Sequence, residues 1–203
     1  MWPWGHLAFA YLLYVGYARV REGRRPTEAT ALLVAVGSQV PDLIDKPFAW
    51  TVPVLPTGRS LAHSLLVVGP VLAAAYVLAR RRDRASRGTD PAAAERRRAT
   101  TPLVVAFAVG TVAHSVGDAL YPLVGLEFEH TRFLLWPALS LTRYDDGGFV
   151  AHFTRMEVTP TFAFELLLVA LALGVWYADG CPGLATVRAW SVRLLRGVTG
   201  AGS

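Results

Sequence analysis

His114 and Asp118 are the pair whose residue types and spacing could most directly do chemistry. They lie four residues apart inside the apolar run from Leu103 to Leu126. On a helix, residues i and i+4 lie on the same face, so the imidazole and the carboxylate would point into one small volume. Neutral imidazoles and carboxylates are ligands of divalent metals. The spacing therefore predicts a metal site on this helix.

More side chains of the same types stand at the ends of other apolar segments: His6, Asp42, Asp45 and His63. Each one alone has an ordinary explanation, as a helix-end turn or as an interfacial histidine with a satisfied hydrogen bond. Together with the first pair they exceed the ligands of one tetrahedral zinc site. We therefore expect either two metals that share a bridging carboxylate, Asp42 or Asp118, or some donors that only orient the ligands.

The composition indicates a membrane protein. Apolar residues make up 53% of the 203 residues, only 17% are charged, and the mean hydropathy is +0.38. These values are unusual for a soluble domain. A soluble helical bundle stays open as the alternative, because buried core helices also contain apolar runs of about 10–14 residues.

The elements that must position these side chains are apolar segments of roughly membrane-spanning length. We predict an all-α, integral membrane helical bundle in residues 1–180, followed by a basic amphipathic cytoplasmic tail in residues 181–203. The five predicted spans are Trp4–Ala18, Ala29–Ile44, Leu61–Ala79, Leu103–Leu123 and Thr161–Ala178.

The basic residues orient these spans. Fifteen of the 20 lie in three segments, after the first span, between the third and fourth, and after the fifth. The positive-inside rule places those segments in the cytoplasm, with the N-terminus outside and the C-terminus inside. Because the arginines alternate with alanine rather than aromatic residues, we expect anionic lipid headgroups as partners and no nucleic acid. In this orientation every histidine and aspartate named above falls on the outer side.

Several sequence segments resemble successive motifs of the LexA-regulated, membrane-bound, metal-dependent hydrolases. They are Gly5–Phe9, Val40–Leu43, Arg59–Leu66, Gly110–Asp118 and Leu134–Pro137. That family is distantly related to zinc-dependent phospholipase C, whose all-helical core binds catalytic metals. The resemblance implies a set of metal ligands: His6, Asp42, His63, His114 and Asp118.

Two positions depart from the family pattern. The second acid of the Pro-Asp motif comes one residue late, at Asp45, and Lys46 follows it. Gly58 stands where the family has the histidine of its His-Arg-Gly motif. Because these departures shift one acid and remove one histidine, they affect the residues that a second metal ion and full activity would need.

The residue types favour zinc, with manganese or iron as alternatives and one or two ions in all. A bound metal would lower the pKa of its water toward about 7 and polarise a phosphoryl oxygen, giving hydroxide attack on a phosphoester. The candidate catalytic residues are Asp45, Arg59 and Glu165. Arg59 could offer a bidentate fork to a phosphate or simply reach the membrane interface. Glu165 could be a general base, or a first-turn acid favoured by the helix dipole.

The long outer segment from Leu126 to Pro160 is expected to form a lid or a pocket wall. His130 and His152 within it could add ligands, although solvated loop histidines are more common.

The sequence thus predicts a multi-pass cell-membrane hydrolase acting on a lipid-borne or amphiphilic phosphoester. Two alternatives stay open. One is a membrane protein that binds or transports metal without catalysis, which would require ligands toward the cytoplasmic side. The other is a structural or regulatory membrane protein in which an inherited metal site only braces the fold.

Overall fold

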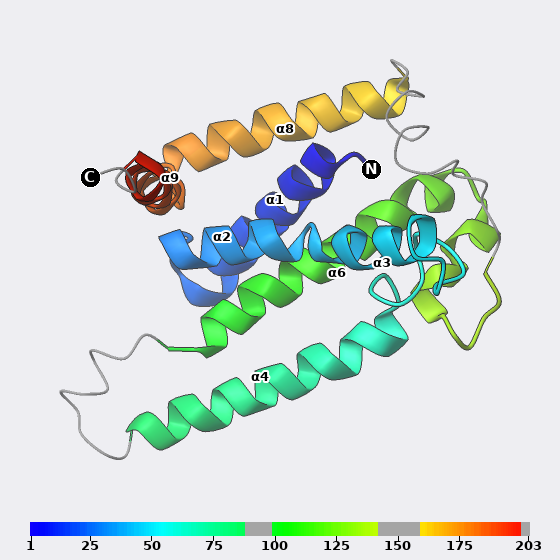
Figure 1. The fold of residues 1–203 in the computed structure, drawn as a ribbon, viewed down its shortest axis with the longest axis horizontal. Helices are drawn as coiled ribbons and strands as arrows, with labels where there is room; N and C mark the ends of the chain where they lie inside the picture. Colours follow the sequence, from blue (N-terminus) through cyan, green and yellow to red (C-terminus); the bar gives the residue numbers. More distant parts are fainter. Residues whose placement is uncertain (88–98, 142–158, 200–203) are drawn as a thin grey trace.

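A computed structural model describes residues 1–87, 99–141 and 159–199 of the chain (Figure 1). Over these residues the fold is all-helical, with no β-strand, which confirms the predicted fold class. The elements are α1 (Pro3–Glu22), α2 (Glu28–Gly37), α3 (Val40–Trp50), α4 (Leu65–Arg87), α6 (Thr101–Val124), the 3₁₀ helix η1 (Phe128–Leu135), α8 (Pro160–Ala178) and α9 (Leu184–Thr199).

Helix α6 is the centre of the bundle. It packs against α1, α2, α4 and η1, and Figure 1 shows it running between α4 on one side and α1 and α2 on the other. Its buried face consists mostly of small residues: Ala106, Gly110, Thr111, Ala113, Ser115, Gly117 and Ala119. Small residues let helix backbones approach closely, which is the usual way that helices associate in membranes.

The closest crossing is that of α2 on α6, at Gly37 and Gly110. A Cβ atom added to Gly110 would lie 2.5 Å from the Val34 carbonyl oxygen, and one added to Gly37 would collide with the Phe107 carbonyl oxygen. Only glycine fits at these two positions. The crossing brings the end of α2 directly onto the middle of α6.

The predicted span Ala29–Ile44 is not one continuous helix. Helix α2 ends at Gly37, and α3 begins at Val40 after a turn at Ser38 and Gln39. Pro41 explains the break, because it lacks the N–H that a continuous helix would need to bond the Gly37 carbonyl. The turn is also held by the Gln39 side-chain amide, which donates to the Pro3 carbonyl over 3.1 Å.

The third predicted span also begins later than expected. Residues 61–64 form a turn, and α4 runs from Leu65 to Arg87, beyond the apolar stretch. The carboxylate of Asp83 then caps the start of α6, accepting hydrogen bonds from the backbone N–H groups of Thr100 and Thr101. This contact joins α4 to α6 at the end of the bundle that is rich in arginine.

Among the described residues, α6 and α8 are the helices long and apolar enough to cross a membrane. The most apolar stretch of α6 is 50% buried within the protein, whereas that of α8 is only 11% buried. Much of α8 therefore presents apolar side chains outward, which is expected where lipid is the solvent. Five spans and their orientation stay predictions.

The bundle has two chemically different ends (Figure 1). The start of α1, the turn before α4 and the second half of α6 meet at one end, which we call the site end. The opposite end carries Arg19 and Arg25, which pair with Asp179 at distances of 2.8 and 3.6 Å. We call it the basic end.

Candidate metal centre

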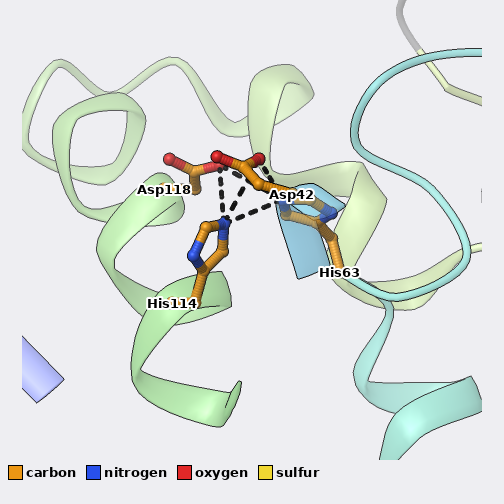
Figure 2. A group of neighbouring side chains, drawn as sticks. All are labelled: Asp42, His63, His114 and Asp118. Carbon is orange, nitrogen blue, oxygen red and sulfur yellow. Dashed lines mark hydrogen bonds and ion pairs between the residues drawn. The ribbon is translucent and has the colours of Figure 1, made fainter. Parts of the chain in front are cut away.

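Four predicted ligands meet at the site end: Asp42, His63, His114 and Asp118. One ligand atom from each lies within 4.8 Å of the others. Asp42 comes from the first turn of α3, His63 from the turn before α4, and the remaining two from α6. Figure 2 shows the two carboxylates converging on the two imidazole rings. We call these four residues the His/Asp group.

Most separations within the His/Asp group are close to those of a tetrahedral metal site. The two Nε2 atoms of His63 and His114 are 3.1 Å apart, and they lie 3.4 and 3.5 Å from Asp42 Oδ1. Asp118 Oδ2 lies 3.5 Å from His63 Nε2 and 3.9 Å from His114 Nε2. A tetrahedral zinc ion with ligands at about 2.0–2.1 Å requires ligand atoms roughly 3.3 Å apart. The group therefore fits an ion of this size.

The hydrogen bonds behind the two rings fix which nitrogen faces the centre. His114 Nδ1 lies 2.6 Å from the Ser38 carbonyl oxygen, which can only accept, so Nδ1 carries the proton. His63 Nδ1 donates in the same way to Asp45 Oδ2 over 2.8 Å. In the neutral rings both Nε2 atoms therefore present lone pairs to each other at 3.1 Å. Two neutral rings in this arrangement repel each other, and either a metal ion between them or a proton on one ring removes the repulsion; with a metal ion, this is the orientation that metal-binding histidines adopt.

Asp42 Oδ1 provides a second sign that the group is built for a cation. This buried oxygen has no hydrogen-bond partner among the described residues. Buried polar atoms without a partner are rare because leaving one unpaired costs about 1–3 kcal/mol. An ion between the four side chains would satisfy it.

Asp45 lies behind His63 rather than among the four. Its carboxylate is fully buried and accepts hydrogen bonds from the backbone N–H groups of Ser60, Ala62 and His63 as well as from the His63 ring. These bonds fold residues 60–63 around Asp45 and hold the His63 ring in place. The contacts make Asp45 a positioning residue, and its predicted catalytic role is untested.

His6 lies beside the His/Asp group without being one of the four. Its ring stacks on that of His114 with centroids 3.7 Å apart, and Nε2 lies 3.1 Å from Asp118 Oδ1. Neither ring nitrogen makes a hydrogen bond within the described residues, although the side chain is only 1% exposed. The same Asp118 oxygen also lies 2.8 Å from the amino nitrogen of Met1.

Two cationic side chains contact the carboxylates of the group. Arg59 Nε lies 2.6 Å from Asp118 Oδ2, so the predicted candidate is indeed at the site. Lys46 Nζ lies 2.6 Å from Asp42 Oδ2. The sequence interpretation noted Lys46 only as a departure from a motif, although it is the one lysine in the chain and that signal was available.

Glu165 is buried at the same end but does not face the His/Asp group. Its oxygens accept hydrogen bonds from the backbone N–H of Trp2 at 3.0 Å and from the Tyr121 hydroxyl at 3.1 Å. These contacts tie the start of α1 to α6 and α8. A catalytic role for Glu165 stays a prediction, while its contacts are those of a structural residue.

Helix η1 closes one side of the site. The buried ring of Phe133 meets the His63 ring edge-on with centroids 6.0 Å apart, and the Ser64 hydroxyl donates to the Trp136 carbonyl. The first part of the predicted lid segment therefore does form a wall. His130 is not one of the four grouped residues, and His152 lies outside the described residues.

One contact of the site has no signal in the sequence. The Ser38 carbonyl that orients His114 is a backbone group, and any residue type could supply it. Only the close crossing of α2 and α6 places it there.

A family model described as YdjM inner membrane protein matches residues 1–196 of the chain. The chain belongs to this family. Membership confirms the predicted membrane localisation, and it confirms the sequence resemblance only as far as a membrane protein family. The family's description names no activity. No curated protein and no solved structure matches the chain.

Proposed function

We propose that the chain is a membrane-bound, metal-dependent hydrolase that acts on phosphoesters through metal-activated water. The observation that carries this proposal is the geometry of His63 and His114, whose Nε2 atoms lie 3.1 Å apart and are faced by two carboxylates, while each Nδ1 contacts an oxygen behind its ring. Neutral imidazoles combined with carboxylates are the ligand set of hydrolytic zinc sites. Zinc is therefore the first candidate, with manganese and iron as alternatives.

Each residue of the site has a defined task in this proposal. A divalent metal held by the His/Asp group would supply a Lewis acid and lower the pKa of a water molecule toward about 7. Asp45 holds the His63 ring in the ligating orientation, and the Ser38 carbonyl does the same for His114. Phe133 limits the access of bulk water from the side of η1.

A second ion has its own support. Asp118 directs Oδ2 toward the two imidazoles of the group and Oδ1 toward His6 Nε2, 3.1 Å away. A carboxylate with one oxygen toward each of two ligand sets is the arrangement of a bridging ligand. The unpaired, buried ring nitrogens of His6 are consistent with a ligand of that second ion. The proposal therefore includes one or two metals, with Asp118 as the bridge.

We place the site at the outer face of the membrane, with five spans, the N-terminus outside and the C-terminus in the cytoplasm. The support is the separation of the site end from the arginine-rich basic end, because arginine-rich loops stay in the cytoplasm. A site at headgroup depth can take a lipid-borne or amphiphilic phosphoester. A phospholipase-like reaction is the leading form of the hypothesis.

Two rival functions make different demands on the same residues. A metal transporter needs ligands along its path, yet within residues 1–87, 99–141 and 159–199 the His/Asp group is the one cluster of this kind. A structural metal site would have the same ligands without turnover. Measured activity separates this second rival from the hydrolase.

The test is phosphoesterase turnover of zinc-loaded, detergent-purified protein on chromogenic phosphomonoesters and phosphodiesters. We expect His63→Ala to lower kcat by more than about 100-fold, beyond the cost of losing a residue that only orients a ligand. His130→Ala, which changes a histidine outside the His/Asp group, is the matched control and should retain activity. Metal bound without turnover on any phosphoester would instead identify the site as a structural brace.

A further inference from the structure

Lys46 is the one lysine among the 20 basic residues of the chain, and it lies at the metal centre. Its Nζ atom contacts Asp42 Oδ2 at 2.6 Å, while Arg59 Nε contacts Asp118 Oδ2 at the same distance. Each carboxylate of the His/Asp group thus contacts one cationic side chain, and Asp118 also contacts the amino group of Met1. Lysine supplies a compact point charge with three donors, and arginine supplies a planar fork, so the two are suited to different oxygens of one anion.

The stem of Lys46 and the backbone turn that carries Arg59 are neighbours in the fold. Lys46 packs against the turn that carries Arg59, because a Cβ atom added to Gly58 would lie 3.3 Å from Lys46 Cγ and from the ring of Trp50. The ammonium group also lies 5.5 Å from the centroid of that ring, a cation–π distance. The aromatic ring and the glycine turn hold the lysine side chain in position beside Arg59.

Burial decreases steadily from the histidines to these cations. The side chains of His63 and His114 are 0% exposed, those of Asp118 and Asp42 are 2% and 12% exposed, and Lys46 and Arg59 reach 14% and 34%. The two cations are therefore the most exposed side chains around the site, and the two histidines are the most buried. A substrate that reaches the site from its exposed side chains meets positive charge first.

We infer that Lys46 and Arg59 form an oxyanion clamp on the more exposed side chains around the metal centre, which binds the non-bridging oxygens of a phosphoryl group. The clamp rests on the proposed function, and it adds the charge that selects the substrate. Two cations and a divalent ion outweigh the charge of the two liganding carboxylates, which favours an anionic ligand over a neutral ester. A lipid headgroup phosphate and inorganic phosphate share this chemistry.

Amine labelling tests the clamp directly, because Lys46 is the one side-chain amine of the chain. Zinc-loaded protein in detergent is acetylated with a water-soluble succinimidyl ester, and the modification of Lys46 is followed by peptide mass. We expect inorganic phosphate to slow the reaction several-fold, and neutral triethyl phosphate to leave it unchanged. A parallel arm uses mixed micelles that contain phosphatidic acid, and stronger protection there assigns the anion to a lipid.

A variant series supplies the second measurement, with the affinity for inorganic phosphate determined by calorimetry at verified zinc content. Lys46→Gln should weaken phosphate binding about tenfold, the scale of one charged hydrogen bond. Lys46→Arg should restore most of it. Arg132→Gln, which removes an exposed cation paired with Glu129, is the control and should bind as the wild type does.

The outcomes separate the clamp from the hydrolase proposal. Two results would overturn the clamp alone. One is a zinc-loaded protein in which neither form of phosphate protects Lys46. The other is a Lys46→Gln variant that binds phosphate as tightly as the wild type does. A wild-type protein that holds no metal would instead overturn the proposed function.

Discussion

Asp45 is the residue on which the orientation of His63 depends. It gathers three backbone N–H groups and the His63 ring around one fully buried carboxylate, so the ring cannot turn without breaking several hydrogen bonds. In metal sites such outer partners fix the tautomer of the ligand and raise its basicity. The metal affinity should therefore depend on a side chain that does not touch the metal.

Asp45→Asn tests this dependence. We expect the zinc affinity to fall about 10–100-fold, the usual cost of losing an outer partner of a ligating histidine. Competition with a chromophoric chelator measures it. Asp179→Asn, which changes an equally buried acid at the basic end, is the control and should leave the affinity unchanged. If Asp45→Asn binds zinc as tightly as the wild type does, the His63 ring does not depend on Asp45 for its orientation.

At the scale of single residues, the sequence predicts which side chains are candidate metal ligands better than it predicts the hydrogen bonds that hold those side chains in place. His114 and Asp118 could be paired from sequence because helical periodicity makes i and i+4 neighbours. The position of Asp45 behind His63 depends on how residues 60–63 fold, and no spacing rule covers such a turn. Lys46 was visible as a unique residue four positions after Asp42, but the pair was not recognised because the predicted span ended at Ile44, whereas α3 continues to Trp50.

At the scale of the elements, the crossing of α2 and α6 positions the centre. The glycine contact at Gly110 brings the backbone of Ser38 to α6, where its carbonyl orients His114 one turn further along. Helix packing and the proposed metal binding are therefore coupled through one backbone segment. A change that separates these helices should weaken both.

Gly110→Ala is the corresponding variant. The added methyl group would lie 2.5 Å from the Val34 carbonyl oxygen and 2.9 Å from Ser38 N, so α2 must move away. We expect a loss of about 1–3 kcal/mol in the free energy of unfolding, as for other overpacked sites. Thermal unfolding in detergent, with and without zinc, measures it.

The control for this variant is Gly174→Ala on α8, where an added Cβ meets nothing within 4 Å. It should retain both the stability and the zinc affinity of the wild type. Equal behaviour of the two alanine variants would contradict the role of the crossing.

Helical periodicity and apolar segments were sufficient to predict the helices themselves, but not the break between α2 and α3. Gly37, Ser38 and Gln39 interrupt the apolar stretch just before Pro41, which is compatible with the first turn of a new helix, but the predicted span ran through this signal. The start of α4 at Leu65 was missed because Leu61 and Ala62, in the preceding turn, already look like the beginning of the apolar segment.

At the scale of the whole molecule, the site and most arginines of the first and last helices lie at opposite ends of one bundle. The outward apolar surface of α8 and the membership in an inner membrane protein family agree with a lipid environment. The proposed direction of insertion rests on the arginines alone. It decides whether the clamp and the metal centre face the cell exterior or the cytoplasm.

The single cysteine of the chain reports this direction. Cys181 follows α8 at the basic end and is partly exposed. A membrane-impermeant maleimide should leave it unmodified in intact spheroplasts and modify it after lysis. Val54→Cys in a Cys181→Ser background places a thiol in the exposed turn after α3, and it should react without lysis. The reverse pattern would place the site in the cytoplasm.

The central claim is that His63, His114, Asp42 and Asp118 hold a divalent metal, and elemental analysis of the purified protein tests it most directly. After loading with zinc and removal of loosely held ions, the wild type should retain about one or two ions per chain. His114→Ala and Asp118→Ala should each lose them, while His130→Ala keeps them. A folded wild-type protein that retains no zinc, manganese or iron would contradict the account.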